Sequence, residues 1–170
     1  MLSYLIQLLF QFLPETRLFG LKRYLLRLRG YDIGENVRIT SSSTFLLKYL
    51  AIGRNTWIGH ETLIAGGDAW IKIGQNVDIG PRCVIINGTH RIHDGIDLKR
   101  RSGEGKSLEI VIGDGSWIGA NSTILGGASI GRGSLIGAGS LILENQNIED
   151  NCLFAGVPAK FIKRFHSQLD

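Results

Sequence analysis

The chain has 170 residues, the size of a single domain, and 44% of them are apolar, which is enough to bury a core. It contains 23 glycines and only 3 prolines, a composition that favours many tight turns over disorder. The net charge of +4 suits an anionic lipid or a phosphate-bearing small molecule. Because no RNA- or DNA-binding motif accompanies this charge, no nucleic acid partner is expected.

Residues 1–30 are predicted to form an amphipathic helical hairpin. The first stretch, MLSYLIQLLFQFL, is apolar, but with about 13 residues it is too short to span a bilayer. It lacks the basic start and the cleavage site of a signal peptide. Leucines then recur at helical spacing between arginines and lysines, at Leu18, Leu21, Leu25 and Leu28. Two interpretations remain open: the hairpin caps the rest of the fold, or it anchors the protein at the cytoplasmic face of a membrane.

Residues 31–155 repeat with a period of six. Seven hexads follow one another without a slip from Ile112, and earlier blocks begin at Ile33, Ile52 and Ile73. Each hexad opens with Ile, mostly followed by Gly, and its fifth position is small or β-branched. A helix would need a period near 3.6, so the pattern predicts very short strands that stack coil on coil and bury a ladder of Ile side chains.

The two cysteines fit this repeat. Cys83 and Cys152 both occupy the small fifth position, so we interpret them as packing residues rather than nucleophiles. No CxxC motif or metal-ligand spacing is present. We therefore expect an intracellular, cytoplasmic protein with no resident metal.

The longest interruption of the period predicts a functional loop over residues 88–110. His90 lies where this loop leaves its coil, and strand alternation directs its side chain outward. A histidine on a rigid edge is well placed to take a proton from a hydroxyl that attacks an acyl carbon. No Ser or Cys nucleophile with a nearby base is visible, which favours direct transfer. Two shorter interruptions run from Ile39 to Ile52 and from Ile64 to Ile73.

The run THRIHDGIDLKRRSGEGKSLEIVIGDGSWIGANSTILGGASIGRGSLIGAGS and the ending AGVPAKFIKRF resemble the hexapeptide-repeat acyltransferases. The similarity is to their sugar O-acetyltransferase branch, which includes galactoside and maltose acetyltransferases. It implies a left-handed parallel β-helix, an all-β solenoid, over residues 31–155. It further implies a homotrimer with active sites between subunits, acetyl-CoA as donor, and a sugar or glycan as acceptor.

The same resemblance assigns roles to individual residues. His90 matches the catalytic general base, and His93 matches a second, supporting histidine. The tail of residues 156–170 is basic and includes the AGVPAK ending. The positions that match cofactor-binding residues of the family are Trp117, Ala120, Ala138, Lys160 and Lys163.

The sequence departs from the family at two places. Leu143 and Glu144 stand where the family often has Thr and Lys, so a cationic contact to coenzyme A is missing there. The Asn that holds the acceptor in galactoside enzymes falls near Thr62. The basic N-terminus resembles that of transferases that modify bacterial surface polysaccharides on lipid-linked precursors.

Three alternatives remain. An amine acceptor needs the same base and donor, so the motif does not exclude N-acetylation of a nucleotide-linked amino sugar, which is the main alternative. A non-catalytic trimeric scaffold that binds a partner through its hairpin predicts no cofactor binding. A carbonic anhydrase-like metal site would need three histidines to converge across a subunit boundary, with His60, His90 and His93 as the candidates.

Overall fold

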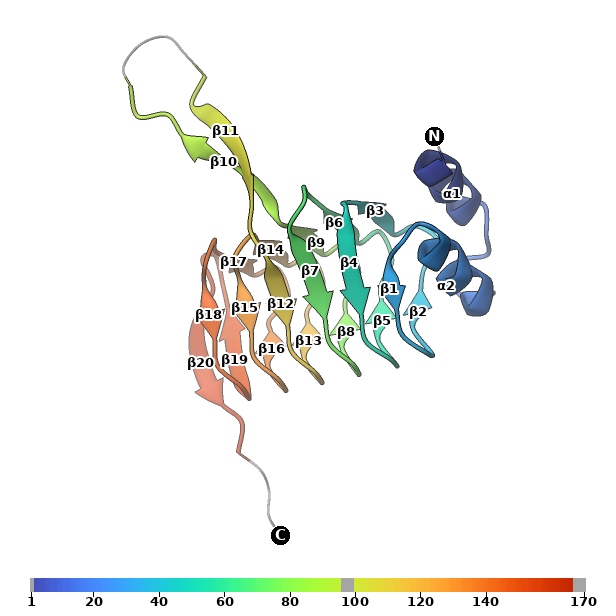
Figure 1. The fold of residues 1–170 in the computed structure, drawn as a ribbon. Helices are drawn as coiled ribbons and strands as arrows, with labels where there is room; N and C mark the ends of the chain where they lie inside the picture. The colour runs from blue at the N-terminus through green and yellow to red at the C-terminus, as the bar shows by residue number, and fades with distance from the viewer. Residues whose placement is uncertain (1, 96–99, 167–170) are drawn as a thin grey trace.

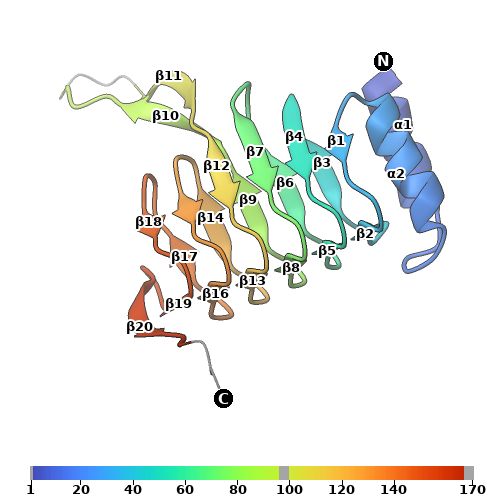
Figure 2. The ribbon, with the colours of Figure 1, turned by 60° about the horizontal axis from the view of Figure 1, so that its bottom comes forward.

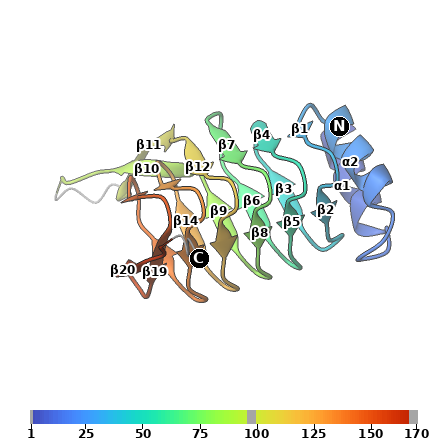
Figure 3. The same ribbon diagram turned by 90° about the horizontal axis from the view of Figure 1, so that it is seen from below.

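Three parallel sheets form the sides of a prism, and the chain winds through them coil after coil (Figures 1 and 3). The computed structural model describes residues 2–95 and 100–166. We name the sheets the first, second and third face, in the order in which each coil visits them. The first face consists of β1 (Asp32–Ile33), β4 (Tyr49–Ile52), β7 (Trp70–Ile73), β12 (Ile110–Ile112), β15 (Ser129–Ile130) and β18 (Asn147–Ile148).

The other two faces continue each coil. The second face consists of β2 (Arg38–Ile39), β5 (Trp57–Ile58), β8 (Asp78–Ile79), β13 (Trp117–Ile118), β16 (Leu135–Ile136), β19 (Cys152–Ala155) and the antiparallel β20 (Lys160–Arg164). The third face consists of β3 (Thr44–Leu46), β6 (Leu63–Ala65), β9 (Val84–Ile86), β14 (Thr123–Leu125) and β17 (Leu141–Ile142). The predicted solenoid of short stacked strands is confirmed.

Aliphatic ladders fill the interior of the prism. Strand partners repeat the same inward residue from coil to coil, as in the register of Ile118 with Ile79 and Ile136. One inward position was missed because the hexads were aligned on Ile: Phe45 is fully buried, and it stands six residues after Ile39. The period therefore continues through residue 45, and the first interruption is shorter than the expected span from Ile39 to Ile52.

The small residues at the fifth position are buried, as predicted, except Thr89, which lies on β10 and is half-buried. Cys83 and Cys152 are buried free thiols. Ser and Thr at this position donate their hydroxyl hydrogens to corner carbonyls of the next coil, as Ser116 does to Gly131 at 2.9 Å and Ser122 to Gly137 at 3.1 Å. Within the described part of the chain, no buried side-chain nitrogen or oxygen lacks a hydrogen-bond partner. Buried polar atoms are costly unless paired, so these bonds let the narrow corners pack closely.

The N-terminal helices close the open end of the first coil (Figure 2). They are α1 (Leu2–Gln11) and α2 (Phe19–Leu28). Strand N–H groups donate to carbonyls of the following coil, as Gly34 does to Ile52 at 2.8 Å, so the first coil has carbonyls that no preceding coil can satisfy. Basic side chains of α2 donate hydrogen bonds to these carbonyls instead. Lys22 donates to Ile39 O at 3.0 Å, and Arg23 donates to Val37 O at 3.1 Å.

Lys22 and Arg23 of α2 therefore face the solenoid beside the buried Leu26, and an apolar side of the helices is left exposed. Among the side chains described, the exposed large ones of the two helices and of the residues that adjoin them are Leu5, Leu9, Phe12, Leu18, Leu21, Tyr24 and Leu28. Phe12 is the most exposed of them, at 85%. Neither helix in the described ranges has the length and hydrophobicity that a transmembrane span requires.

A hairpin projects from one edge of the prism (Figure 1). It consists of β10 (Gly88–Ile92) and β11 (Ser102–Ser107), and we call it the arm. The segment expected to be a loop thus contains two paired strands, and the coil resumes at β12. Residues 96–99 of that segment, and 167–170 of the predicted tail, lie outside the described residues. All three interruptions of the repeat fall where the chain passes from the third face to the next first face, which we call the arm edge.

Candidate functional site

His90 lies in the middle of β10, with an exposed side chain. It pairs with Gly105 of β11, and the register shifts between His90 and Ile92. Such a bulge re-aims side chains and is common beside active sites. The expected outward direction of His90 is therefore found, but the residue stands on the arm rather than on the coil itself.

A backbone carbonyl fixes the tautomer of His90. Its Nδ1 lies 3.0 Å from the carbonyl oxygen of Gly103. A carbonyl oxygen only accepts hydrogen bonds, so Nδ1 carries the hydrogen in the neutral ring. The lone pair is then on Nε2, which is the arrangement that a general base needs.

Asn87 clamps the base of the arm. Its side chain is fully buried, accepts from Gly67 N at 2.9 Å and donates to Ala69 O at 2.6 Å. Its backbone carbonyl accepts from Leu108 N at 2.9 Å, which joins the two ends of the arm. Gly66 has a φ of 146°, and a Cβ there would lie 1.7 Å from Asn87 Oδ1, so only glycine fits. The hexad pattern gave no signal for this clamp.

A second contact ties the arm to a later coil. Lys106 Nζ lies 2.5 Å from Glu144 Oε1, and each side chain is about one-third exposed. Glu144 is the residue that departs from the family pattern. In the structure, Glu144 pairs with Lys106 of the arm. An ion pair that anchors the arm thus occupies the position where the resemblance predicts a cationic contact to coenzyme A.

His93 lies farther along the arm and is half-buried. Its backbone N–H donates to Arg101 O at 2.8 Å, and Arg101 Nη1 donates to His93 O at 2.9 Å. These bonds close the arm just beyond β10 and β11. His93 therefore shares the arm with His90.

The predicted cofactor residues lie on a different side of the prism. Trp117 begins β13 on the second face and is 52% exposed. Ala120 and Ala138 follow β13 and β16, at the edge between the second and third faces, which we call the alanine edge. They occupy successive coils, because Gly139 N, next to Ala138, donates to Ala120 O at 2.8 Å. Close stacking is required here: a Cβ on Gly119 would lie 2.5 Å from Ala138 N.

The C-terminal lysines lie near the end of that edge. Lys160 begins β20 and pairs with Ala155, and Lys163 pairs with Leu153. Both side chains are exposed, and the Lys163 ammonium lies 5.2 Å from the centre of the Phe165 ring. Trp117, the two alanines and the two lysines thus share the second face and the alanine edge.

One chain does not bring the two groups together. The arm edge joins the third and first faces, so it lies across the prism from the second face. His90 projects from the former and Trp117 from the latter. A site that uses both must take them from two chains.

Two other candidates lie elsewhere. Thr62 is fully buried and donates to Gly80 O at 3.2 Å, so it is not exposed to an acceptor. His60 Nδ1 lies 3.5 Å from Glu15 Oε1, beside the N-terminal helices. No group of three His, Cys, Asp or Glu side chains suited to a metal occurs among the residues with described positions.

Comparison with known proteins bears on the repeats and the fold. Residues 109–144 match the family model described as bacterial transferase hexapeptide (six repeats). The galactoside O-acetyltransferase of Escherichia coli (strain K12) is 33% identical over 137 residues, which are 80% of this chain and 64% of that protein. The matched region thus spans less than two thirds of that relative's length.

Two solved structures extend the comparison. A galactoside acetyltransferase in complex with coenzyme A has a TM-score of 0.79 and 26% identity, over 98% of this chain and 80% of that one. The N-acyltransferase AntD from Bacillus cereus, in complex with dTDP and 3-hydroxybutyryl-CoA, has a TM-score of 0.70 and 25% identity, over 82% of this chain and 74% of that one. Residues 109–144 thus match the repeat of bacterial hexapeptide transferases. Both of these solved structures are acyltransferases, and they contain coenzyme A or an acyl-CoA.

Proposed function

We propose that the protein transfers an acetyl group from acetyl-CoA to a sugar hydroxyl, with His90 as the general base. The observation that carries this proposal is the 3.0 Å contact of His90 Nδ1 with Gly103 O, which leaves Nε2 as the proton acceptor. The similarity to galactoside O-acetyltransferase supports the choice of donor and acceptor.

The reaction is a direct acyl transfer. Nε2 takes the proton of the acceptor hydroxyl as its oxygen attacks the thioester carbonyl. A C–O bond forms, and the C–S bond breaks when the tetrahedral intermediate collapses. The thiolate of coenzyme A leaves and takes the proton from the imidazolium, so His90 returns to its neutral form.

Coenzyme A is proposed to lie along the second face and the alanine edge. Ala120 and Ala138 leave room for a cofactor close to the backbone, and Trp117 offers an exposed aromatic surface. Lys160 and Lys163 provide positive charge for the phosphates. Because His90 projects from the arm edge, across the prism from the second face, the site is proposed to form between neighbouring chains of a homotrimer, with His93 as a supporting residue on the arm.

The acceptor is proposed to be a precursor of a surface polysaccharide or glycolipid. The exposed apolar side of α1 and α2 supports this idea, because an apolar helical surface of this kind is suited to a membrane interface. Helix α1, LSYLIQLLFQ, carries no charge, and α2 contains no acidic residue. The protein would then be cytoplasmic, with the cap resting on the membrane surface.

N-acylation of an amino sugar is the second candidate. The similarity to AntD, whose structure contains dTDP and an acyl-CoA, favours it specifically. Direct transfer to an amine uses the same base and donor, so only the acceptor panel separates the two reactions. A trimeric scaffold without catalysis is separated from both by its failure to bind acetyl-CoA.

The test is release of coenzyme A from acetyl-CoA over a panel of sugars and nucleotide-linked amino sugars. His90→Ala should lower turnover at least about a hundredfold with acetyl-CoA binding retained, as expected for loss of a general base. His166→Ala is the matched control, because His166 is exposed near the C-terminus and should leave turnover unchanged. Full activity in His90→Ala would refute the assignment, and a folded protein that does not bind acetyl-CoA would refute the transferase proposal.

A further inference from the structure

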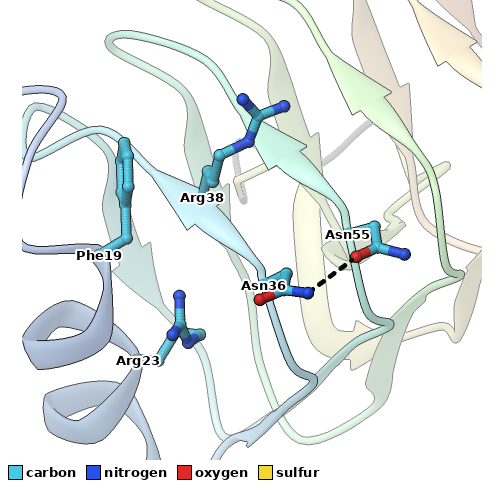
Figure 4. Close-up of a pocket in the computed structure, with 5 residues that line it drawn as sticks. All are labelled: Phe19, Arg23, Asn36, Arg38 and Asn55. Carbon is cyan, nitrogen blue, oxygen red and sulfur yellow. Dashed lines mark hydrogen bonds between the residues drawn. The ribbon is translucent and has the colours of Figure 1, made fainter.

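A pocket lined by arginines opens at the third edge of the prism, where the first face passes into the second. It has a volume of about 420 Å³ and is lined by Phe19, Arg23, Asn36, Arg38 and Asn55. Figure 4 shows Phe19 and Arg23 on the side of α2, and the other three residues on the side of the solenoid. None of the residues assigned to acetyl transfer lines this pocket.

Both guanidinium groups are available to an anion. Arg23 donates to Val37 O at 3.1 Å, and the Arg38 guanidinium lies 5.3 Å from the centre of the Trp57 ring. Among the residues that the structure describes, neither arginine forms an ion pair with a carboxylate. Each is thus oriented by a neutral group and retains its positive charge for a ligand. Two arginines in one pocket are the usual protein device for binding phosphate.

The asparagines add a defined polar contact. Asn36 and Asn55 occupy left-handed corner positions, with φ of 55° and 59°. Asn36 Nδ2 donates to Asn55 Oδ1 at 3.3 Å, and Asn55 Nδ2 donates to Asn76 Oδ1 at 3.1 Å. This ladder directs Asn36 Oδ1 toward α2 (Figure 4), where it can accept a hydrogen bond from a ligand hydroxyl.

Phe19 completes the pocket with an apolar wall. Its ring packs edge-on against Trp57, with centroids 6.3 Å apart. The pocket therefore combines two positive charges, an acceptor for a hydroxyl and an aromatic surface. This combination suits a phosphate ester of a polyol better than a bare inorganic anion or a nucleic acid strand.

We propose that this pocket binds the phosphate group of an organic phosphate, such as a sugar phosphate, at a site separate from acetyl transfer. The phosphate lies between Arg23 and Arg38, and a neighbouring hydroxyl donates to Asn36. The same chemistry is offered by a soluble sugar phosphate and by the phosphate of a lipid headgroup. The proposal does not depend on the transferase activity.

The test measures binding to the full-length protein by calorimetry and vesicle sedimentation. The probes are glucose 1-phosphate in solution, and vesicles of phosphatidylglycerol beside vesicles of phosphatidylcholine. Arg38→Gln is the informative variant, because the Arg38 guanidinium makes no hydrogen bond to the backbone among those found in the structure, whereas the Arg23 guanidinium donates to Val37 O of the first coil. Arg132→Gln is the matched control: it removes the same charge from an exposed arginine paired with Asp150 at the far end of the prism.

We expect Arg38→Gln to weaken binding of the phosphate probe at least about tenfold, because a charge-assisted contact is lost, and Arg132→Gln to leave it unchanged. Arg38-dependent binding of glucose 1-phosphate identifies a soluble source, and Arg38-dependent binding of phosphatidylglycerol vesicles alone identifies a lipid headgroup. Equal weakening by both substitutions, or no binding of either probe to the wild-type protein, would overturn the proposal. Binding by His90→Ala should equal that of wild type, so the result stands apart from the fate of the transferase assignment.

Discussion

At the scale of single residues, basic side chains of α2 donate the hydrogen bonds that a preceding coil would otherwise supply. Lys22 is fully buried and donates to Glu15 O at 2.6 Å and to Ile39 O at 3.0 Å. Its ammonium also lies 5.3 Å from the centre of the Phe19 ring. Burial lowers the pKa of Lys22 below its usual value of 10.5, and the charge of Glu15 partly opposes that change. The hydrogen bonds to carbonyls explain why a lysine occupies a buried position.

Lys22→Met should lower the free energy of unfolding at pH 7 by about 1–3 kcal/mol, because two acceptors lose their donor. Urea denaturation measures this free energy, and Lys48→Met, which alters an exposed lysine, should change it by less than about 0.5 kcal/mol.

The stability of the wild-type protein should also depend on pH through Lys22. Between the lowered pKa of Lys22 in the folded state and 10.5, the unfolded chain binds more protons, so the contribution of Lys22 to wild-type stability should rise with pH in that window. A Lys22→Met variant as stable as wild type, with the same pH dependence, would contradict this account.

The residues that sequence could predict are those set by the repeat. Cys83 and Cys152 occupy a position whose size is fixed by neighbouring coils, so their burial follows from the hexad. Asn87 and Glu144 could not be assigned in this way, because their partners, Ala69 and Lys106, lie outside the hexads. Contacts between an irregular segment and a regular one leave no periodic trace.

At the scale of elements, the arm is the part that the repeat did not reveal. Periodic apolar residues mark strands that bury one side, and the arm buries little. The SGEGKS sequence of β11 has no apolar alternation, so its pairing with β10 depends on backbone hydrogen bonds. The positions of the three interruptions in the repeat carried information about the fold. Each interruption follows a strand of the third face, so all three lie at the arm edge.

The ion pair of Lys106 with Glu144 should hold the arm without stabilising the fold much. Glu144→Lys should speed hydrogen exchange in β10 and β11 and lower acetyl transfer severalfold, while stability changes by less than about 1 kcal/mol, because partly exposed pairs contribute little. The double exchange Lys106→Glu with Glu144→Lys should restore both properties. Failure of the double exchange to restore them would show that the pair does not position the arm.

At the scale of the whole molecule, the two N-terminal helices, which form the cap, and the arm have different roles. The cap ends the stack and leaves an apolar surface, and the arm carries the histidine away from the coils. The proposed membrane contact would orient the entire solenoid relative to a bilayer.

Phe12→Ser should reduce sedimentation with anionic vesicles at least about threefold, because an exposed aromatic is lost from the apolar face. Phe161→Ser, which alters an exposed aromatic at the other end of the prism, is the control and should bind as wild type does. Equal binding by wild type and Phe12→Ser would argue against a membrane role for the cap.

His90 of one chain is proposed to act together with the alanine edge of a neighbouring chain. The test assembles mixed trimers from two inactive variants. His90→Ala lacks the base, and Ala138→Trp blocks the cofactor at the alanine edge. Trimers that contain both chains are isolated with two affinity tags, and acetyl transfer is measured against each parent. Because one of three interfaces in such a trimer pairs an intact arm with an intact edge, about a third of wild-type activity should return. Mixed trimers as inactive as their parents would contradict a site shared between chains.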